Sequence, residues 1–179
     1  MKIFVPDLEK HEGEFIPFIR QVSLASLGVD LPGCDQSCMT VTFHASYVAG
    51  RVLVRGQWQV ELTGECSRCL AQTAFSLTEQ FTEEFIPLRG AAAEGGENTV
   101  ASEGEETLVY AGEVLDLKEY LRQSFLMAQP LKILCREDCR GLCPGCGVDR
   151  NREECRCREE AIDPRLRVLM ALKDKKQLQ

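Results

Sequence analysis

The sequence predicts an α+β fold: an antiparallel β-sheet or meander with one or two packing helices and a C-terminal cysteine-rich zinc ribbon. Three features support this prediction: a two-residue hydrophobic period over residues 41–85, a helical period over residues 117–128, and cysteines in close pairs. Apolar and polar residues alternate over 41–47, 52–62 and 75–85. A two-residue period sustained over three segments is typical of antiparallel strands with one buried face.

Two further segments are predicted as strands, and one as a helix that follows them. Residues 15–22 form a weaker strand candidate that Pro17 interrupts, and residues 108–115 are expected to return as a strand. Asp116 is the expected cap of a helix over about 116–129, with Glu119 completing a capping-box pattern. The helix ends before Pro130.

The chain divides into three predicted regions. A β-rich domain spans 1–130, a zinc-ribbon module spans 131–160, and a short helix with a basic tail spans 161–179. Asp163 and Pro164 mark the start of the last helix. Within the first region, residues 90–106 carry five acids, four glycines and no aromatic residue, which predicts a flexible acidic insertion.

Composition excludes several classes of protein. With 44% hydrophobic residues the chain can bury a core, and no apolar run of 18 residues exists to span a membrane. The first residues lack the pattern of a signal peptide, so a cytoplasmic location is expected, where ten cysteines do not form disulfides. A net charge of −7 argues against nucleic-acid binding through bulk electrostatics, although residues 165–179 are locally basic.

Eight cysteines form four close pairs, and these are the predicted metal ligands: Cys66 and Cys69, Cys135 and Cys139, Cys143 and Cys146, and Cys155 and Cys157. Structural zinc takes four thiolates in a tetrahedron, commonly from two such pairs, so two zinc ions per chain are expected. In Cys143-Pro144-Gly145-Cys146-Gly147, proline shapes the turn and the glycines let backbone N–H groups approach the sulfur atoms.

The preferred grouping places Cys143, Cys146, Cys155 and Cys157 in one site and Cys66, Cys69, Cys135 and Cys139 in the other. A rival grouping takes the four cysteines from 135 to 146 as one site, because they are spaced by four, four and three residues. Gly141 and Pro144 oppose the continuous helix that would align them. Cys34 and Cys38 lie outside the pairs and are expected to bind no metal.

Arginines crowd the cysteines, and the candidate RNA contacts are Arg68, Arg140, Arg150, Arg152, Arg156 and Arg158. Guanidinium groups suit phosphate recognition. They also offset the formal charge of −2 on a zinc ion with four thiolates. The two interpretations are compatible.

Catalysis is not predicted, and neither is a small-molecule substrate. The only histidines are His11 and His44, and no phosphate loop, dinucleotide fingerprint or metalloprotease motif is present. Zinc bound by four thiolates has no open position for a reacting water.

The cysteine-rich segment also resembles a known family. Cys135-Arg-Glu-Asp-Cys-Arg-Gly-Leu-Cys-Pro-Gly-Cys-Gly147, with Asn151 and Asp163-Pro164-Arg165-Leu166, is similar to the YceD family of large ribosomal RNA subunit accumulation proteins. The segment Cys66-Ser-Arg-Cys-Leu70 matches a second hallmark, and the resemblance covers about residues 40–172. It implies a bacterial or organellar factor, without enzymatic activity, that supports accumulation of 23S ribosomal RNA.

Three functional hypotheses follow. The leading one is a factor for ribosome biogenesis that contacts large-subunit rRNA or a ribosomal protein. The second is a redox-responsive zinc module, since closely spaced thiolates are open to oxidation. The third is a protein-interaction adaptor that uses the acidic insertion.

Overall fold

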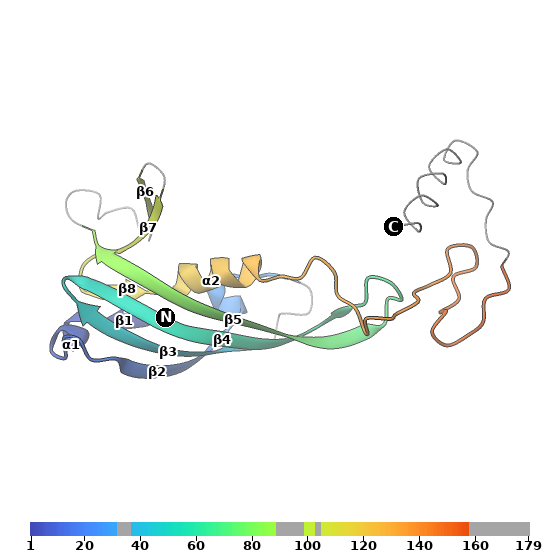
Figure 1. Ribbon diagram of the computed structural model, residues 1–179, viewed down its shortest axis with the longest axis horizontal. Coiled ribbons are helices and arrows are strands. Elements are labelled where there is room, and N and C mark those ends of the chain that lie inside the picture. Colours follow the sequence, from blue (N-terminus) through green and yellow to red (C-terminus); the bar gives the residue numbers. More distant parts are fainter. Residues whose placement is uncertain (32–36, 89–98, 103–104, 158–179) are drawn as a thin grey trace, which may run out of the picture.

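A six-stranded mixed sheet with strand order β2-β3-β4-β5-β7-β6 is the centre of the fold (Figure 1). The computed structural model describes residues 1–31, 37–88, 99–102 and 105–157. No helix within these ranges is long and apolar enough to cross a membrane. In chain order the elements are β1 (Lys2–Phe4), α1 (Val5–Glu9), β2 (Ile16–Ser23), the 3-10 helix η1 (Ala25–Leu27), β3 (Cys38–Val48), β4 (Arg51–Glu65), β5 (Gln72–Pro87), β6 (Thr99–Ser102), β7 (Glu105–Tyr110), β8 (Val114–Asp116) and α2 (Lys118–Met127).

The three predicted alternating segments form β3, β4 and β5, which pair antiparallel. Val41 lies opposite Trp58, and Val60 lies opposite Leu77, so the apolar positions share one face of the sheet. Trp58 is completely buried. The antiparallel meander predicted from the hydrophobic period is therefore confirmed for these strands.

Helix α2 covers the apolar face of the sheet (Figure 1). Its buried residues are Leu121 and Phe125, and the Phe125 ring lies 6.2 Å from that of Trp58. The Trp58 indole Nε1 donates a hydrogen bond of 2.9 Å to Ser124 Oγ. Burying each such side chain contributes roughly 1.5–3 kcal/mol, so α2 is held chiefly by this contact with the sheet.

The start of α2 differs from the prediction. The helix begins at Lys118. The Lys118 backbone N–H donates a hydrogen bond of 3.0 Å to the Asp116 carboxylate, so Asp116 does accept a backbone hydrogen bond at the start of the helix. Glu119 does not complete a capping box, because its carboxylate accepts from the side chains of Arg122 and Gln123 instead. The predicted helix from Asp163 lies outside the described residues.

The described residues from 99 to 115 also differ from the prediction, whereas residues 90–98 and 103–104 of the expected flexible insertion lie outside the described residues. Part of the expected flexible insertion forms β6 and the start of β7, which pair antiparallel. The strand expected over 108–115 is two strands, because Gly112, with a φ of +67°, turns the chain away from the sheet. β8 then pairs with β1 in a separate two-stranded sheet, whereas β7 runs parallel to β5.

β2 forms at the edge of the sheet, where Pro17 is tolerated because an edge strand leaves one row of backbone groups unpaired. The hydrophobic period did not predict β1, α1 or η1. Each of them is only three to five residues long.

Gly56 in the middle of β4 allows close packing against β3, and replacing it tests the register. In Gly56→Ala the new Cβ would lie 2.4 Å from both Phe43 Cβ and the Thr42 backbone oxygen. We expect the free energy of unfolding to fall by about 1–3 kcal/mol in urea titrations. The exposed neighbour serves as control: Gln57→Ala should change it by less than about 0.5 kcal/mol. Equal stability of the two variants would contradict the prediction.

Candidate metal centres

The first pair of cysteines lies at the tip of the β4–β5 hairpin, which extends well beyond α2 (Figure 1). The Cys66 N–H donates to Ala71 O at 2.9 Å, and the Leu70 N–H donates to Cys66 O at 2.9 Å. Leu70 has a φ of +59°, so the tip is a tight turn with a left-handed residue. This turn places the two sulfur atoms on the same side of the tip.

The chain after α2 returns to this tip and brings the second pair. The Ser67 N–H donates to Ile133 O at 2.8 Å, and the Ile133 N–H donates to Ser67 Oγ at 3.2 Å. Gly64 makes room for the approach, since a Cβ there would lie 2.7 Å from Ile133 Cδ1. Arg68 Nη1 then donates to the backbone oxygens of Cys139 at 2.8 Å and Glu137 at 3.2 Å. These contacts join segments that are more than 60 residues apart.

The four sulfur atoms of Cys66, Cys69, Cys135 and Cys139 lie within 4.8 Å of one another. The Cys66–Cys139 and Cys69–Cys135 sulfur separations are 3.8 Å and 3.7 Å. A tetrahedral ion with metal–sulfur bonds of about 2.3 Å places its sulfur atoms about 3.8 Å apart. This first cluster therefore has the dimensions of a four-thiolate metal site, and all its members except Cys135 are buried.

Cys143, Cys146, Cys155 and Cys157 form a second cluster, also within 4.8 Å. The Cys155 sulfur lies 3.7 Å from that of Cys146 and 3.2 Å from that of Cys143. The Gly147 N–H donates to Cys143 O at 2.8 Å, and Gly147 has a φ of +74°, which closes the predicted turn. Only Cys143 is buried, so this second cluster is the more exposed of the two.

These two clusters coincide with the preferred grouping of the eight cysteines. The predicted zinc ribbon is not confirmed: among the described residues around the clusters, Leu142 and Asp149 form an isolated bridge. The described part of the cysteine-rich segment is therefore characterised by its turns and by the positions of its sulfur atoms. Cys38 lies exposed at the start of β3 and belongs to neither cluster, while Cys34 lies outside the described residues.

Each cluster contains thiols whose pKa values move in opposite directions. Hydrogen bonds from backbone N–H groups lower the pKa of Cys66 and of Cys143 to about 6. The largest contribution comes from the Cys135 N–H for Cys66 and from the Cys146 N–H for Cys143. Burial and the neighbouring thiols raise the pKa of Cys135 to about 12, and the thiols of Cys146 and Cys155 raise that of Cys157 to about 12. Because two of these thiols have raised pKa values, holding all four members of a cluster as thiolates would require a nearby cation, such as a divalent metal ion.

Asn151 joins the two clusters, a role that the sequence analysis did not assign to it. Its Nδ2 donates to Cys139 Sγ at 3.4 Å and to Asp149 Oδ1 at 2.7 Å. Its Oδ1 accepts from the Arg140 backbone N–H and from Arg136 Nη2, both at 2.8 Å. The Asn151 backbone N–H is also the main cause that lowers the pKa of Asp149. One amide thus fixes a ligand of the first cluster against the loop that carries the second.

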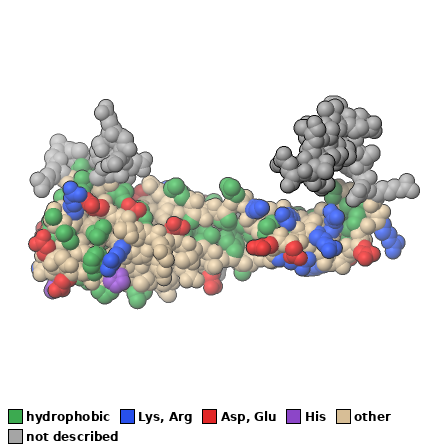
Figure 2. Space-filling model, viewed as in Figure 1, with side chains coloured by type: hydrophobic (Ala, Val, Ile, Leu, Met, Phe, Trp, Pro, Cys, Tyr) green, Lys and Arg blue, Asp and Glu red, His purple; other side chains and the backbone are tan. Residues whose placement is uncertain are grey.

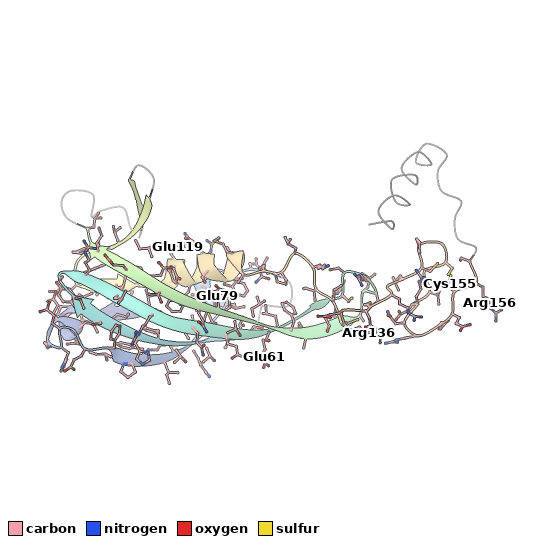
Figure 3. The ribbon with its side chains drawn as sticks, viewed as in Figure 1. Glu61, Glu79, Glu119, Arg136, Cys155 and Arg156 are labelled. Carbon is pink, nitrogen blue, oxygen red and sulfur yellow. The ribbon has the colours of Figure 1, made fainter. Side chains whose placement is uncertain are left out.

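The candidate RNA-contacting arginines differ in their surroundings. Lys and Arg side chains gather, with acids among them, at the end of the molecule that carries the cysteine-rich loops (Figure 2), where Arg136 and Arg156 are labelled in Figure 3. Arg68 holds the hairpin tip, Arg152 lies 3.5 Å from the Asp149 carboxylate, and Arg158 lies outside the described residues. Arg140, Arg150 and Arg156 are exposed. An open hollow of about 610 Å³ is lined by Arg140, Arg150, Asn151, Arg152, Glu153, Glu154 and Cys155.

The fold and the two clusters define a β-sheet protein with two four-cysteine sites, able to hold metal ions, at one end of a long hairpin. The family model of the large ribosomal RNA subunit accumulation protein YceD matches residues 54–173, so the chain belongs to the YceD family. Membership implies a role in the accumulation of large-subunit ribosomal RNA.

Comparison with curated proteins finds related chains whose printed descriptions state no function. Uncharacterized proteins of Mycobacterium bovis and Mycobacterium tuberculosis are 31% identical to the chain over 151 residues. The aligned region covers 84% of this chain and 70% of theirs. No solved structure matches the chain significantly.

Replacing Asn151 tests its link to the first cluster. Asn151→Ala removes the donor to Cys139 Sγ and the acceptor for Arg140, so cobalt(II) should bind the first cluster about 10- to 100-fold more weakly. Cobalt titrations followed by thiolate charge-transfer absorption would measure this in a Cys146→Ser background, which silences the second cluster. In a Cys66→Ser background, which silences the first, the same substitution should change affinity much less. Equal losses in the two backgrounds would contradict the assignment.

Proposed function

We propose that this protein is a non-enzymatic factor that supports 23S rRNA accumulation, holding one zinc ion in each cluster and binding large-subunit rRNA through the arginines around the second cluster. The proposal has two parts, the metal and the RNA contact. They rest on different observations and are tested separately.

Zinc is proposed from the chemistry of the donor set. All eight ligands are cysteine sulfurs, and soft thiolates in a tetrahedral arrangement favour zinc over magnesium or calcium. Four protein ligands fill the coordination shell, which favours a structural role over hydrolysis. In this role the ions would supply the folding free energy of the cysteine-rich loops, while the hydrogen bonds from Ser67, Arg68 and Asn151 orient them.

The RNA contact is carried by one observation: Arg140, Arg150 and Arg156 have no ion-pair partner among the residues that the structure describes. By contrast, Arg136 and Arg152 lie near Asp138 and Asp149. Unpaired guanidinium groups are free to bind phosphate oxygens in a bidentate manner. Because the whole chain carries −7, this contact would be local and would depend on where these side chains lie.

Metal content gives the first test. Gently purified protein should contain about two zinc ions per chain by elemental analysis. Cys146→Ser should lose one ion and keep the sheet folded, as judged by circular dichroism. Cys66→Ser should also lose one ion, but should in addition release the cysteine-rich loops from the hairpin tip, making them sensitive to protease. Native protein with one ion or none would defeat the two-site model.

RNA binding gives the second test. Replacing Arg140, Arg150 and Arg156 by Gln should leave zinc content unchanged and weaken binding to large-subunit rRNA. Each lost phosphate contact should reduce the magnitude of the slope of log affinity against log salt by about 0.7–0.9, so the three together should reduce it by about 2–3. The matched control replaces Arg20, Arg55 and Lys118 by Gln, which makes the same change in net charge away from the clusters.

In cells, the same variants distinguish arginines that bind RNA from arginines that only offset the negative charge of the thiolates. A strain lacking the protein should accumulate less large-subunit than small-subunit rRNA. The control variant should restore the ratio and the cluster variant should not. If the cluster variant restores the ratio and binds RNA with an unchanged salt slope, these arginines only compensate thiolate charge.

A further inference from the structure

One long edge of the sheet is unpaired over most of its length in the described part of the chain. β5 pairs with β4 from Gln72 to Phe85 on one side. On its other side only Phe85, Ile86 and Pro87 pair, with β7. An unpaired edge presents a row of backbone donors and acceptors that another extended chain can bind.

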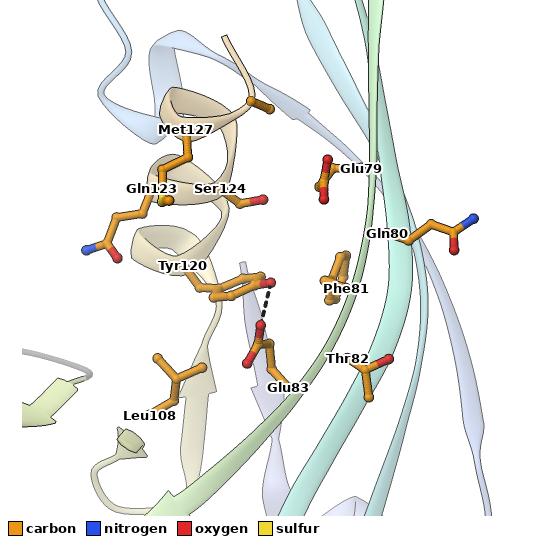
Figure 4. Close-up of a pocket in the computed structure, with 11 residues that line it drawn as sticks. Glu79, Gln80, Phe81, Thr82, Glu83, Leu108, Tyr120, Gln123, Ser124 and Met127 are labelled. Atoms are coloured by element: carbon orange, nitrogen blue, oxygen red, sulfur yellow. Dashed lines mark hydrogen bonds between the residues drawn. The ribbon is translucent and has the colours of Figure 1, made fainter. Parts of the chain in front are cut away.

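A hollow of about 560 Å³ lies beside this edge, between β5 and α2 (Figure 4). Its aromatic residues are in contact, with the Phe81 and Tyr120 rings 5.5 Å apart. Met127, which also lines the hollow, is 87% exposed. Apolar side chains exposed next to a sheet edge offer a pocket for the side chains of a bound strand.

The hollow is acidic. Glu79 and Glu83 line it, and none of its lining residues is Lys or Arg. Glu83 Oε1 accepts a hydrogen bond of 3.0 Å from the Tyr120 hydroxyl, while Glu79 has no hydrogen-bond or ion-pair partner among the described residues. These two acids are four residues apart on one strand, so they lie on the same face about 13 Å apart. Phe81 lies between them on that face.

We propose that the free edge of β5 and the hollow beside α2 bind an extended basic segment of a partner protein, which adds a strand to the sheet. The spacing defines the partner's sequence: two cationic residues four positions apart meet Glu79 and Glu83, and an apolar residue midway between them packs on Phe81. Backbone hydrogen bonds to β5 supply affinity, and the two acids supply specificity for a basic segment. This surface is distinct from the arginines proposed to bind RNA.

A labelled peptide with a Lys-Thr-Val-Thr-Lys core tests the proposal on the full-length, zinc-loaded protein without RNA. It should bind, and Glu79→Gln with Glu83→Gln should weaken binding about fivefold to thirtyfold, as expected for the loss of two partly exposed ion pairs. The matched control replaces Glu61 and Glu113 by Gln, with the same charge change elsewhere, and should bind as the wild type does. Hydrogen exchange should slow in residues 76–84 when the peptide binds.

Peptide chemistry distinguishes strand addition from simple charge attraction without altering the protein. A backbone N-methylated peptide of the same sequence should lose binding, and so should a Glu-Thr-Val-Thr-Glu peptide. Unchanged binding of either peptide would overturn the proposal, as would unchanged binding by the Glu79 and Glu83 variant.

Three other occupants of this edge are separable outcomes, each of which would overturn the assignment to a partner protein. Tighter peptide binding after removal of residues 165–179 would assign the hollow to the basic tail of this chain. A dimer that dissociates on adding the peptide would assign it to a second copy. Competition by rRNA that persists in the Arg140, Arg150 and Arg156 variant would assign it to RNA.

Discussion

The fold and the two cysteine clusters depend on the register of one hairpin. β4 and β5 pair without interruption from Val52 opposite Phe85 to Glu65 opposite Gln72. Because side chains alternate along a strand, a slip of one residue would turn Trp58 to solvent and would also reverse the side from which the hairpin tip meets the returning loop. Core packing beneath α2 therefore also fixes where Cys66 and Cys69 lie. The β4–β5 register thus determines both the core beneath α2 and the cysteine positions at the hairpin tip.

Metal ligation, as proposed, would offset the cost of closing a long loop. The first cluster joins Cys66 to Cys139, 73 residues away, and the few apolar side chains packed on it are only partly buried: Ala71, Leu134 and Leu142. Such a small hydrophobic contact cannot balance the entropy of ordering the loops by itself. Hydrogen bonds from Ser67 and Arg68 set the geometry of the loops, and a bound metal ion would supply the free energy that holds it.

Features that depend on residues close in sequence were predicted, and features that depend on residues far apart in sequence were not. The strands β3 to β5 and the helix α2 were predictable because their periods are local, and the cysteine clusters because each pair is close in sequence. β7 was expected as a strand, but its parallel pairing with β5 was not, since Leu108 meets Phe85 only through the fold. Asn151 gave no spacing signal, because its partners range from Asp149 to Arg136 and follow no period.

The acidic hollow beside α2 and the exposed arginines of the cysteine-rich loops lie at different places along the hairpin, although Glu153 and Glu154 stand among those arginines. Glu79 lies opposite Trp58, eight residues before Cys66 on β4, so at the strand rise of about 3.3 Å it lies about 26 Å from the hairpin tip. That distance is more than twice the screening length of about 8 Å at physiological salt. The acids beside α2 would therefore do little to weaken the proposed contact of Arg140 and Arg150 with phosphate. If both proposals hold, a polyanion at the cysteine-rich end and a basic segment beside α2 would not compete for the same surface, and the β4–β5 hairpin would set the distance between them.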